Sequence, residues 1–145
     1  MQDIYVVGVG MTPFGKFRDK TIKDMTGEAV AAALTDAGVP ADRIDGAFFS
    51  NAVQGHMEGQ HMIRGEIALR EMGIQGIPVV NVENACASAS TGFKLAVDFL
   101  KAGNGDCCLA VGAEKMYSDD RALMFSAFDS GWDVSNGEEV AQRLA

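Results

Sequence analysis

Short apolar runs and apolar residues at helical spacing follow one another along the chain, and this order predicts its elements. Four short runs rich in β-branched or small apolar residues indicate buried strands. They cover residues 4–9, 47–53, 79–82 and 107–111. Three of these runs are preceded or followed closely by Gly or Pro, which is typical of strands in a compact domain.

Between these runs, the apolar spacing predicts three helices. The first begins after Thr21, which forms a capping-box pattern with Asp24, and it ends at Gly38. The second covers about residues 62–72 and the third residues 89–101. The alternation of strands and helices predicts an α/β fold with a largely parallel sheet covered by helices.

The pattern changes after Tyr117. Asp, Ser and Gly interrupt the apolar spacing from there on, and residues 138–145 resemble the beginning of a helix. We therefore divide the chain into an α/β unit over residues 1–118 and a different segment over residues 119–145.

Composition and charge exclude several classes of protein. The 145 residues are 48% hydrophobic and 22% charged, which suits one compact core. The net charge of −8 disfavours nucleic acid and anionic membranes as partners. No apolar run approaches the roughly 20 residues of a membrane span, and residues 1–10 do not resemble a signal peptide. We expect a soluble, cytoplasmic protein with no membrane span and no nucleic-acid partner.

The glycines of the first predicted strand invite comparison with a dinucleotide-binding turn. Gly8 and Gly10 follow a strand-like run, but Pro13 stands where the third glycine of that motif belongs. The predicted helix begins only near Thr21, too late for its N-terminus to meet a phosphate. The sequence favours a glycine-rich exit from a strand.

Cys86 lies at the junction of a predicted strand and a predicted helix. Its neighbours Ala85, Ala87 and Ser88 are all small, as a sharp turn that presents a nucleophile requires. Backbone N–H groups at the start of a helix stabilise a thiolate and can supply part of an oxyanion hole. The position fits a nucleophile, and it fits equally well a small buried apolar residue.

The other candidate chemistry is weaker. Cys107 and Cys108 lie within an apolar strand, where thiols are inert core residues. His56 and His61 lack the spacing of a metalloprotease motif, and we expect polar loop residues and no metal site.

Several motifs together carry a resemblance to a known family. Residues 84–88, Asn-Ala-Cys-Ala-Ser, resemble the acyl-cysteine motif of the thiolase superfamily, and Gly112–Met116 followed by Ser118 resembles its Gly-x-Glu-x-Met-Ser segment. Gly59-Gln60 followed by Arg64 is also similar to that family. The resemblance implies the N-terminal βαβαβαββ half of a layered αβαβα fold. It also implies that residues 119–145 begin the family's loop domain.

The resemblance implies a function and a set of site residues. Cys86 is then the catalytic nucleophile that accepts an acyl group from an acyl-CoA, with Met116 and Ser88 binding substrate. The coenzyme A thioester is the substrate, no other cofactor is implied, and the assembly is a homodimer or tetramer. The family's base and second cysteine belong to a C-terminal half, so we expect that half to be needed for activity.

Two alternatives stay open at this stage. A ketoacyl synthase or hydroxymethylglutaryl-CoA synthase also uses a cysteine at this elbow. A non-catalytic partner subunit would keep the fold without the chemistry, and the lack of a candidate base in this sequence favours that reading.

Overall fold

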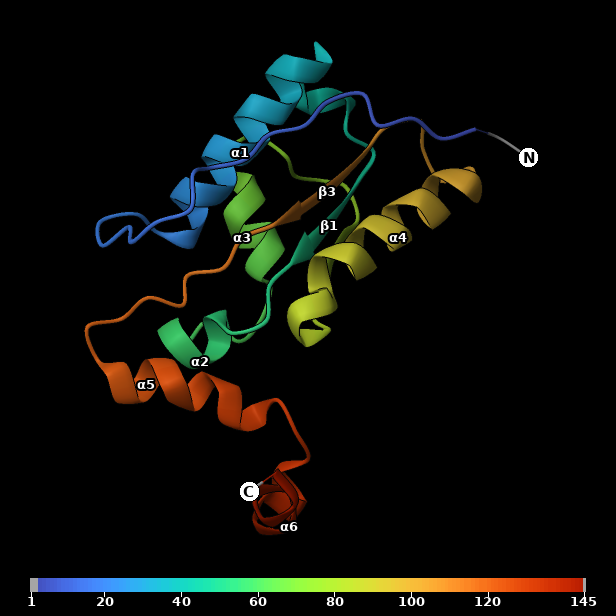
Figure 1. Ribbon diagram of the computed structural model, residues 1–145. Helices are drawn as coiled ribbons and strands as arrows, with labels where there is room; N and C mark the ends of the chain where they lie inside the picture. The colour runs from blue at the N-terminus through green and yellow to red at the C-terminus, as the bar shows by residue number, and fades with distance from the viewer. Residues whose placement is uncertain (1–2, 145) are drawn as a thin grey trace.

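The computed structural model describes residues 3–144 and contains a three-stranded parallel sheet (Figure 1). Its strands are β1 (Gly46–Ser50), β2 (Val79–Val82) and β3 (Cys108–Gly112), in the order β2-β1-β3. Every residue of the central strand β1 is buried. The α/β class is confirmed, and because the strands are parallel their carboxyl ends meet at one edge of the sheet.

Helices cover both faces of this sheet. Figure 1 shows α1 (Ile22–Ala37) and α3 (Arg64–Arg70) on one side and α4 (Ser88–Lys101) on the other. Neighbouring residues of β1 point to opposite faces, so Phe49 packs with α1 and α3 while Phe48 packs with α4. The core is therefore two apolar layers that share the sheet.

The capping box predicted at the start of α1 is confirmed. The Thr21 hydroxyl accepts a hydrogen bond from the Asp24 N–H at 3.1 Å, and the Asp24 carboxylate accepts one from the Thr21 N–H at 2.7 Å. An ion pair between Lys23 and Glu71 then joins α1 to the end of α3. These contacts fix the pair of helices that covers one face of the sheet.

The strand predicted over residues 4–9 does not form. That segment runs beside α1 (Figure 1), and its glycines lie so close that a Cβ on Gly10 would be 2.1 Å from the Ala29 carbonyl oxygen. Within residues 3–144, its backbone pairs with none of the three strands. The prediction was wrong because a strand needs a neighbouring strand, and the nearest one, β3, lies across a groove.

Element boundaries differ from the predictions elsewhere too. β1 ends at Ser50, and the short helix α2 (Gln54–Glu58) follows it, which the apolar spacing did not predict. The helix predicted over residues 62–72 is the shorter α3. By contrast, β2 has the predicted limits, and α4 ends at the predicted Lys101.

The remaining helices lie at the C-terminal end, beyond the sheet. Figure 1 shows α5 (Arg121–Ser126) and α6 (Gly137–Leu144) away from the faces of the sheet. Four 3-10 turns complete the structure: η1 (Ala41–Arg43), η2 (Ala85–Ala87), η3 (Ala127–Ser130) and η4 (Val134–Asn136). Among residues 3–144, no helix combines the length and apolarity needed to cross a membrane.

Candidate active site

Cys86 lies in the elbow that joins β2 to α4. The turn η2 leads directly into α4, so the cysteine sits at the carboxyl edge of the sheet and at the start of a 14-residue helix. Its side chain is exposed, which overturns the reading of Cys86 as a buried apolar residue. The preceding Ala85 has φ +45°, a left-handed conformation that costs a non-glycine residue about 1 kcal/mol or more. Such strain often marks functional turns.

Hydrogen bonds within the turn hold this conformation. The Ser88 hydroxyl donates to the Ala85 carbonyl at 2.7 Å and accepts from the Asn84 N–H at 2.8 Å. The Glu83 carboxylate accepts from the Ala85 N–H at 2.6 Å. Ser88 is buried, so both partners of its hydroxyl belong to the elbow itself.

The central strand supports the elbow from below. The Ser50 hydroxyl, at the end of β1, donates to the Ser88 carbonyl at 3.0 Å. Gly92, one turn into α4, packs against the same hydroxyl, and a Cβ there would lie 2.5 Å from the Ser50 Oγ. A larger residue at position 92 would therefore push α4 away from the strand that anchors Cys86.

Asn51 is the centre of a second polar cluster at the same edge. It is only 3% exposed. Its amide nitrogen donates to the Ala113 carbonyl at 2.7 Å and to the Glu114 carboxylate at 2.9 Å. Its amide oxygen accepts from an Arg64 guanidinium N–H at 2.7 Å and from the Gln54 N–H at 3.0 Å. One buried side chain thus joins the end of β3 to the starts of α2 and α3.

Glu114 extends this cluster into the loop after β1. Its carboxylate accepts hydrogen bonds from the backbone N–H groups of Ala52, at 2.8 Å, and Val53, at 3.2 Å. The loop that follows β1 is therefore held against the segment that follows β3. Both segments border the carboxyl edge at which Cys86 is placed.

β2 is joined to α3 in a similar way. The Asn81 amide oxygen accepts from the Gly65 N–H at 2.6 Å, and its amide nitrogen donates to the Glu66 carboxylate at 2.7 Å. Asn81 lies five residues before Cys86 on the strand that leads into the elbow. Side-chain amides therefore fix the ends of both β1 and β2.

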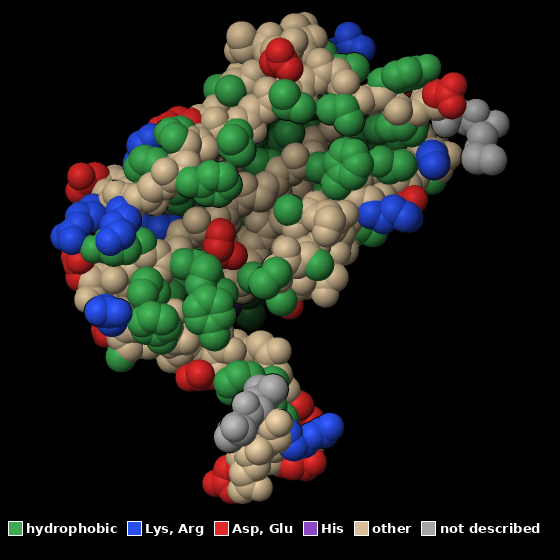
Figure 2. Space-filling view, in the orientation of Figure 1, with side chains coloured by type: hydrophobic (Ala, Val, Ile, Leu, Met, Phe, Trp, Pro, Cys, Tyr) green, Lys and Arg blue, Asp and Glu red, His purple; other side chains and the backbone are tan. Residues whose placement is uncertain are grey.

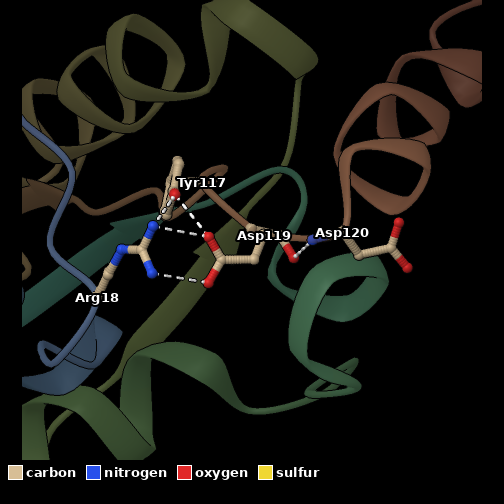
Figure 3. Close-up of polar contacts among 5 residues, drawn as sticks. Arg18, Tyr117, Asp119 and Asp120 are labelled. Carbon is tan, nitrogen blue, oxygen red and sulfur yellow. Dashed lines mark hydrogen bonds and ion pairs between the residues drawn. The ribbon is translucent and has the colours of Figure 1, made fainter.

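The segment after β3, which contains Met116, is fastened to the loop before α1 (Figure 3). Arg18 pairs with the Asp119 carboxylate through both terminal nitrogens, at 3.0 and 2.9 Å, and donates to the Tyr117 hydroxyl at 2.8 Å. Lys115 donates to the backbone carbonyl of Lys20 at 2.6 Å. Met116 itself is half-buried within this fastened segment.

The two thiols in the strand differ from Cys86. Burial raises the pKa of Cys107 above its ordinary value and raises the pKa of Cys108 to about 11. Both groups are therefore protonated thiols near neutral pH, as their apolar setting predicted. Cys86 is left as the exposed cysteine of the described chain.

No metal-binding group takes shape in the part of the chain that the structure describes. Nowhere in residues 3–144 do three His, Cys, Asp or Glu side chains come together as a possible site. His56 instead contacts the Ser126 hydroxyl at 2.9 Å through Nε2, which links α2 to α5. That contact is structural.

Sequence reasoning identified only part of this arrangement. It placed Cys86 correctly on an exposed elbow, and it singled out Ser88, whose hydroxyl the structure engages within the turn. It did not identify Ser50 and Asn51. Their signal was available, since two polar residues end an otherwise apolar strand at the edge where parallel strands present functional groups.

A family model and curated relatives match nearly the whole chain. The model described as "Thiolase, N-terminal domain" matches residues 4–142. The chain is 34% identical over 125 residues to sterol carrier protein 2 of Gallus gallus, covering 85% of this chain and 22% of that protein. It is 33% identical over 139 residues to an acetyl-CoA acetyltransferase of Methanothermobacter thermautotrophicus, covering 94% of this chain and 36% of that protein.

Solved structures agree on the fold. The chain superposes on the Acat5 thiolase of Ascaris suum, solved in complex with coenzyme A, with a TM-score of 0.69 and 18% identity over 82% of this chain and 33% of that one. It superposes on the priming β-ketosynthase of the R1128 polyketide pathway with a TM-score of 0.61 and 26% identity, over 75% of this chain and 33% of that one. The chain spans about a third or less of the length of most of these proteins.

Proposed function

The chain belongs to the thiolase family, whose N-terminal domain it matches over residues 4–142, and from that premise we propose that Cys86 is an acyl-accepting nucleophile. The substrate is an acyl-CoA thioester, and the reaction transfers its acyl group to or from a second thioester. The observation that carries this proposal is the exposed Cys86 on a strained strand-to-helix elbow.

The acylation step follows from the chemistry of thiols. The Cys86 thiolate attacks the thioester carbonyl carbon, a new carbon–sulfur bond forms, and the bond to coenzyme A breaks. Coenzyme A leaves as a thiolate and takes up one proton, equal to the proton that Cys86 lost. The exchange of one thioester for another is nearly balanced in energy, so the site must chiefly position the reactants and stabilise the oxyanion.

The elbow offers groups for both tasks. Backbone N–H groups at the start of α4 are oriented toward the carboxyl edge, as an oxyanion requires. The loops that Asn51 and Glu114 fix form the neighbouring wall of the same edge. We propose that Met116 and Ser88 contribute to the substrate site through this edge, Met116 by contact and Ser88 by holding the turn.

The test is the mass of the intact protein after exposure to acetyl-CoA. We expect an increase of one acetyl group, about 42 Da, that is lost on treatment with hydroxylamine and is absent in Cys86→Ser. The matched control is Cys107→Ser, which removes a thiol from the strand and must leave the adduct unchanged. An adduct that persists in Cys86→Ser, or no adduct on the chain when it is joined to a thiolase C-terminal half, would refute the proposal.

The reaction class needs a second measurement. A thiolase forms or cleaves acetoacetyl-CoA from acetyl-CoA alone, whereas a ketoacyl synthase requires a malonyl thioester as the carbon donor. Product analysis with each thioester separates the two. An assembly that never forms an acyl-enzyme while folded and dimeric would instead act as a non-catalytic partner subunit.

A further inference from the structure

An apolar groove of about 640 Å³ separates the N-terminal segment, residues 3–10, from the sheet. Figure 2 shows hydrophobic side chains on both sides of a hollow on this face of the molecule. α1 and α4 form its two sides, and β3 forms one end. The groove therefore lies in the plane of the sheet, beside the outer edge of β3.

The outer edge of β3 presents unpaired backbone groups to the groove. On its inner edge, the Cys107 carbonyl accepts from the Asp45 N–H at 2.8 Å, and the Ala113 N–H donates to the Ser50 carbonyl at 3.2 Å. Backbone groups alternate in direction along a strand, so the residues between them with even numbers point away from β1. The residues that present N–H and C=O groups to the groove are Cys108, Ala110 and Gly112.

The opposite wall is a second extended segment with free backbone groups. Gly8 and Gly10 hold it against the backbone of α1, and the Val9 N–H donates to the Asp36 carboxylate at 2.9 Å. Its apolar side chains stay exposed, from 61% for Val7 to 74% for Tyr5. The segment is thus anchored on one side and incomplete on the other.

The two sides of the groove are both apolar. Val30, Ala33 and Leu34 line it from α1, and Val97, Leu100 and the half-exposed Phe93 line it from α4. A lipid could cover these side chains, but it would leave the backbone groups on both walls without partners, at a cost of several kcal/mol by the usual penalties (roughly 1–3 kcal/mol each). A β-strand with apolar residues on both faces satisfies the side chains and the backbone together.

We propose that this groove holds a single apolar β-strand, supplied by polypeptide outside residues 3–144, that hydrogen-bonds to β3 on one side and to the N-terminal segment on the other. Insertion would turn three paired strands into five and would make residues 4–9 a strand. The relatives support such an occupant, because this chain spans only 22% and 36% of the two described above. The inference is independent of the function proposed for Cys86.

The test supplies a strand and measures hydrogen exchange. The 145-residue chain is extended at its C-terminus by a flexible Gly/Ser linker of about 30 residues, whose root-mean-square reach is roughly 30 Å. The linker ends in Val-Ile-Val-Ile-Val. We expect the amides of Cys108, Ala110 and Gly112 to exchange at least tenfold more slowly than in a matched extension ending in Val-Ile-Pro-Ile-Val. The inward-pointing amide of Leu109 serves as the reference for an intact β1–β3 ladder.

Three results would overturn the proposal. The first is equal exchange at Cys108, Ala110 and Gly112 in both extensions. The second is equally slow exchange in the unextended chain at low concentration, which would mean that residues 4–9 pair with β3 directly. The third is protection that rises with protein concentration, which would assign the groove to a second copy. None of these results depends on whether Cys86 accepts an acyl group.

Discussion

At the scale of single residues, the three thiols differ in their surroundings, and this difference sets their reactivity. Cys86 is exposed on its turn, whereas burial raises the pKa of Cys108 to about 11. At pH 8, a group with that pKa is a thiolate in only about one molecule in a thousand. We expect iodoacetamide to label Cys86 at least tenfold faster than Cys108, as measured by peptide mass mapping over time.

The control for this labelling is denatured protein. In urea the burial that distinguishes the cysteines is lost, so the labelling rates of Cys86, Cys107 and Cys108 should converge. Comparable rates for Cys86 and Cys108 in the native protein would contradict the structure.

The left-handed backbone of Ala85 gives a second prediction. Glycine adopts φ +45° without the steric cost that alanine incurs, so Ala85→Gly should raise the free energy of unfolding by up to about 1 kcal/mol. Ala87→Gly, two residues later at φ −94°, should lower it by about 0.5–1 kcal/mol. Urea denaturation measures both, and effects of the same sign in the two variants would refute the assigned strain.

At the scale of elements, Asn51 connects the ends of strands and helices that otherwise meet only through loops. Asn51→Ala would leave the Ala113 carbonyl and the Arg64 guanidinium without their partner. We expect the free energy of unfolding to fall by about 1–3 kcal/mol. Asn104→Ala, on an exposed turn after α4, should change it by no more than about 0.5 kcal/mol. Equal effects of the two substitutions would show that the Asn51 cluster contributes nothing special.

The elements that sequence analysis predicted well are those whose pattern is local. Thr21 and Asp24 specify the start of α1 within one turn, and the β-branched run Val79–Val82 coincides with β2. Residues 4–9 show the limit of such patterns. They have the composition of a strand, but strand pairing depends on a neighbour that no local pattern reveals.

The site was predictable to a similar extent. Small residues around Cys86 predicted an elbow, because only they fit a sharp strand-to-helix turn. The support from Ser50 and Asn51 was not predicted, since those residues lie more than thirty positions from the elbow and reach it only through the parallel register.

At the scale of the whole molecule, the sheet is held at one end by a carboxylate. Asp45, just before β1, accepts hydrogen bonds from the N–H groups of Cys107 and Asp106, and these bonds lower the pKa of Asp45 below its ordinary value. The folded state therefore favours the ionised form. This contribution is complete above the ordinary pKa, near 4, and is lost as the pH falls through the lowered pKa of the folded protein.

Acid unfolding tests this contribution. Asp45→Asn should lower the stability near neutral pH and flatten its dependence on pH below about 4, as measured by circular dichroism across a pH series. Asp42→Asn, on the exposed turn η1, should leave the pH dependence unchanged. An unchanged acid profile in Asp45→Asn would show that the loop before β3 is held by other contacts.

The central place of β1 has a consequence for the order in which the chain can fold as it is synthesised. Ala47 pairs with Val79 on one side and with Leu109 on the other, so both partners of the first strand are made after it. A nascent chain that has reached Ser50 carries two adjacent phenylalanines with nothing yet to cover them. The ribosome must add some sixty further residues, about 3–12 seconds of synthesis at usual rates, before the sheet can close. During that interval, the protection of β1 from aggregation falls to α1, the one long helix already complete.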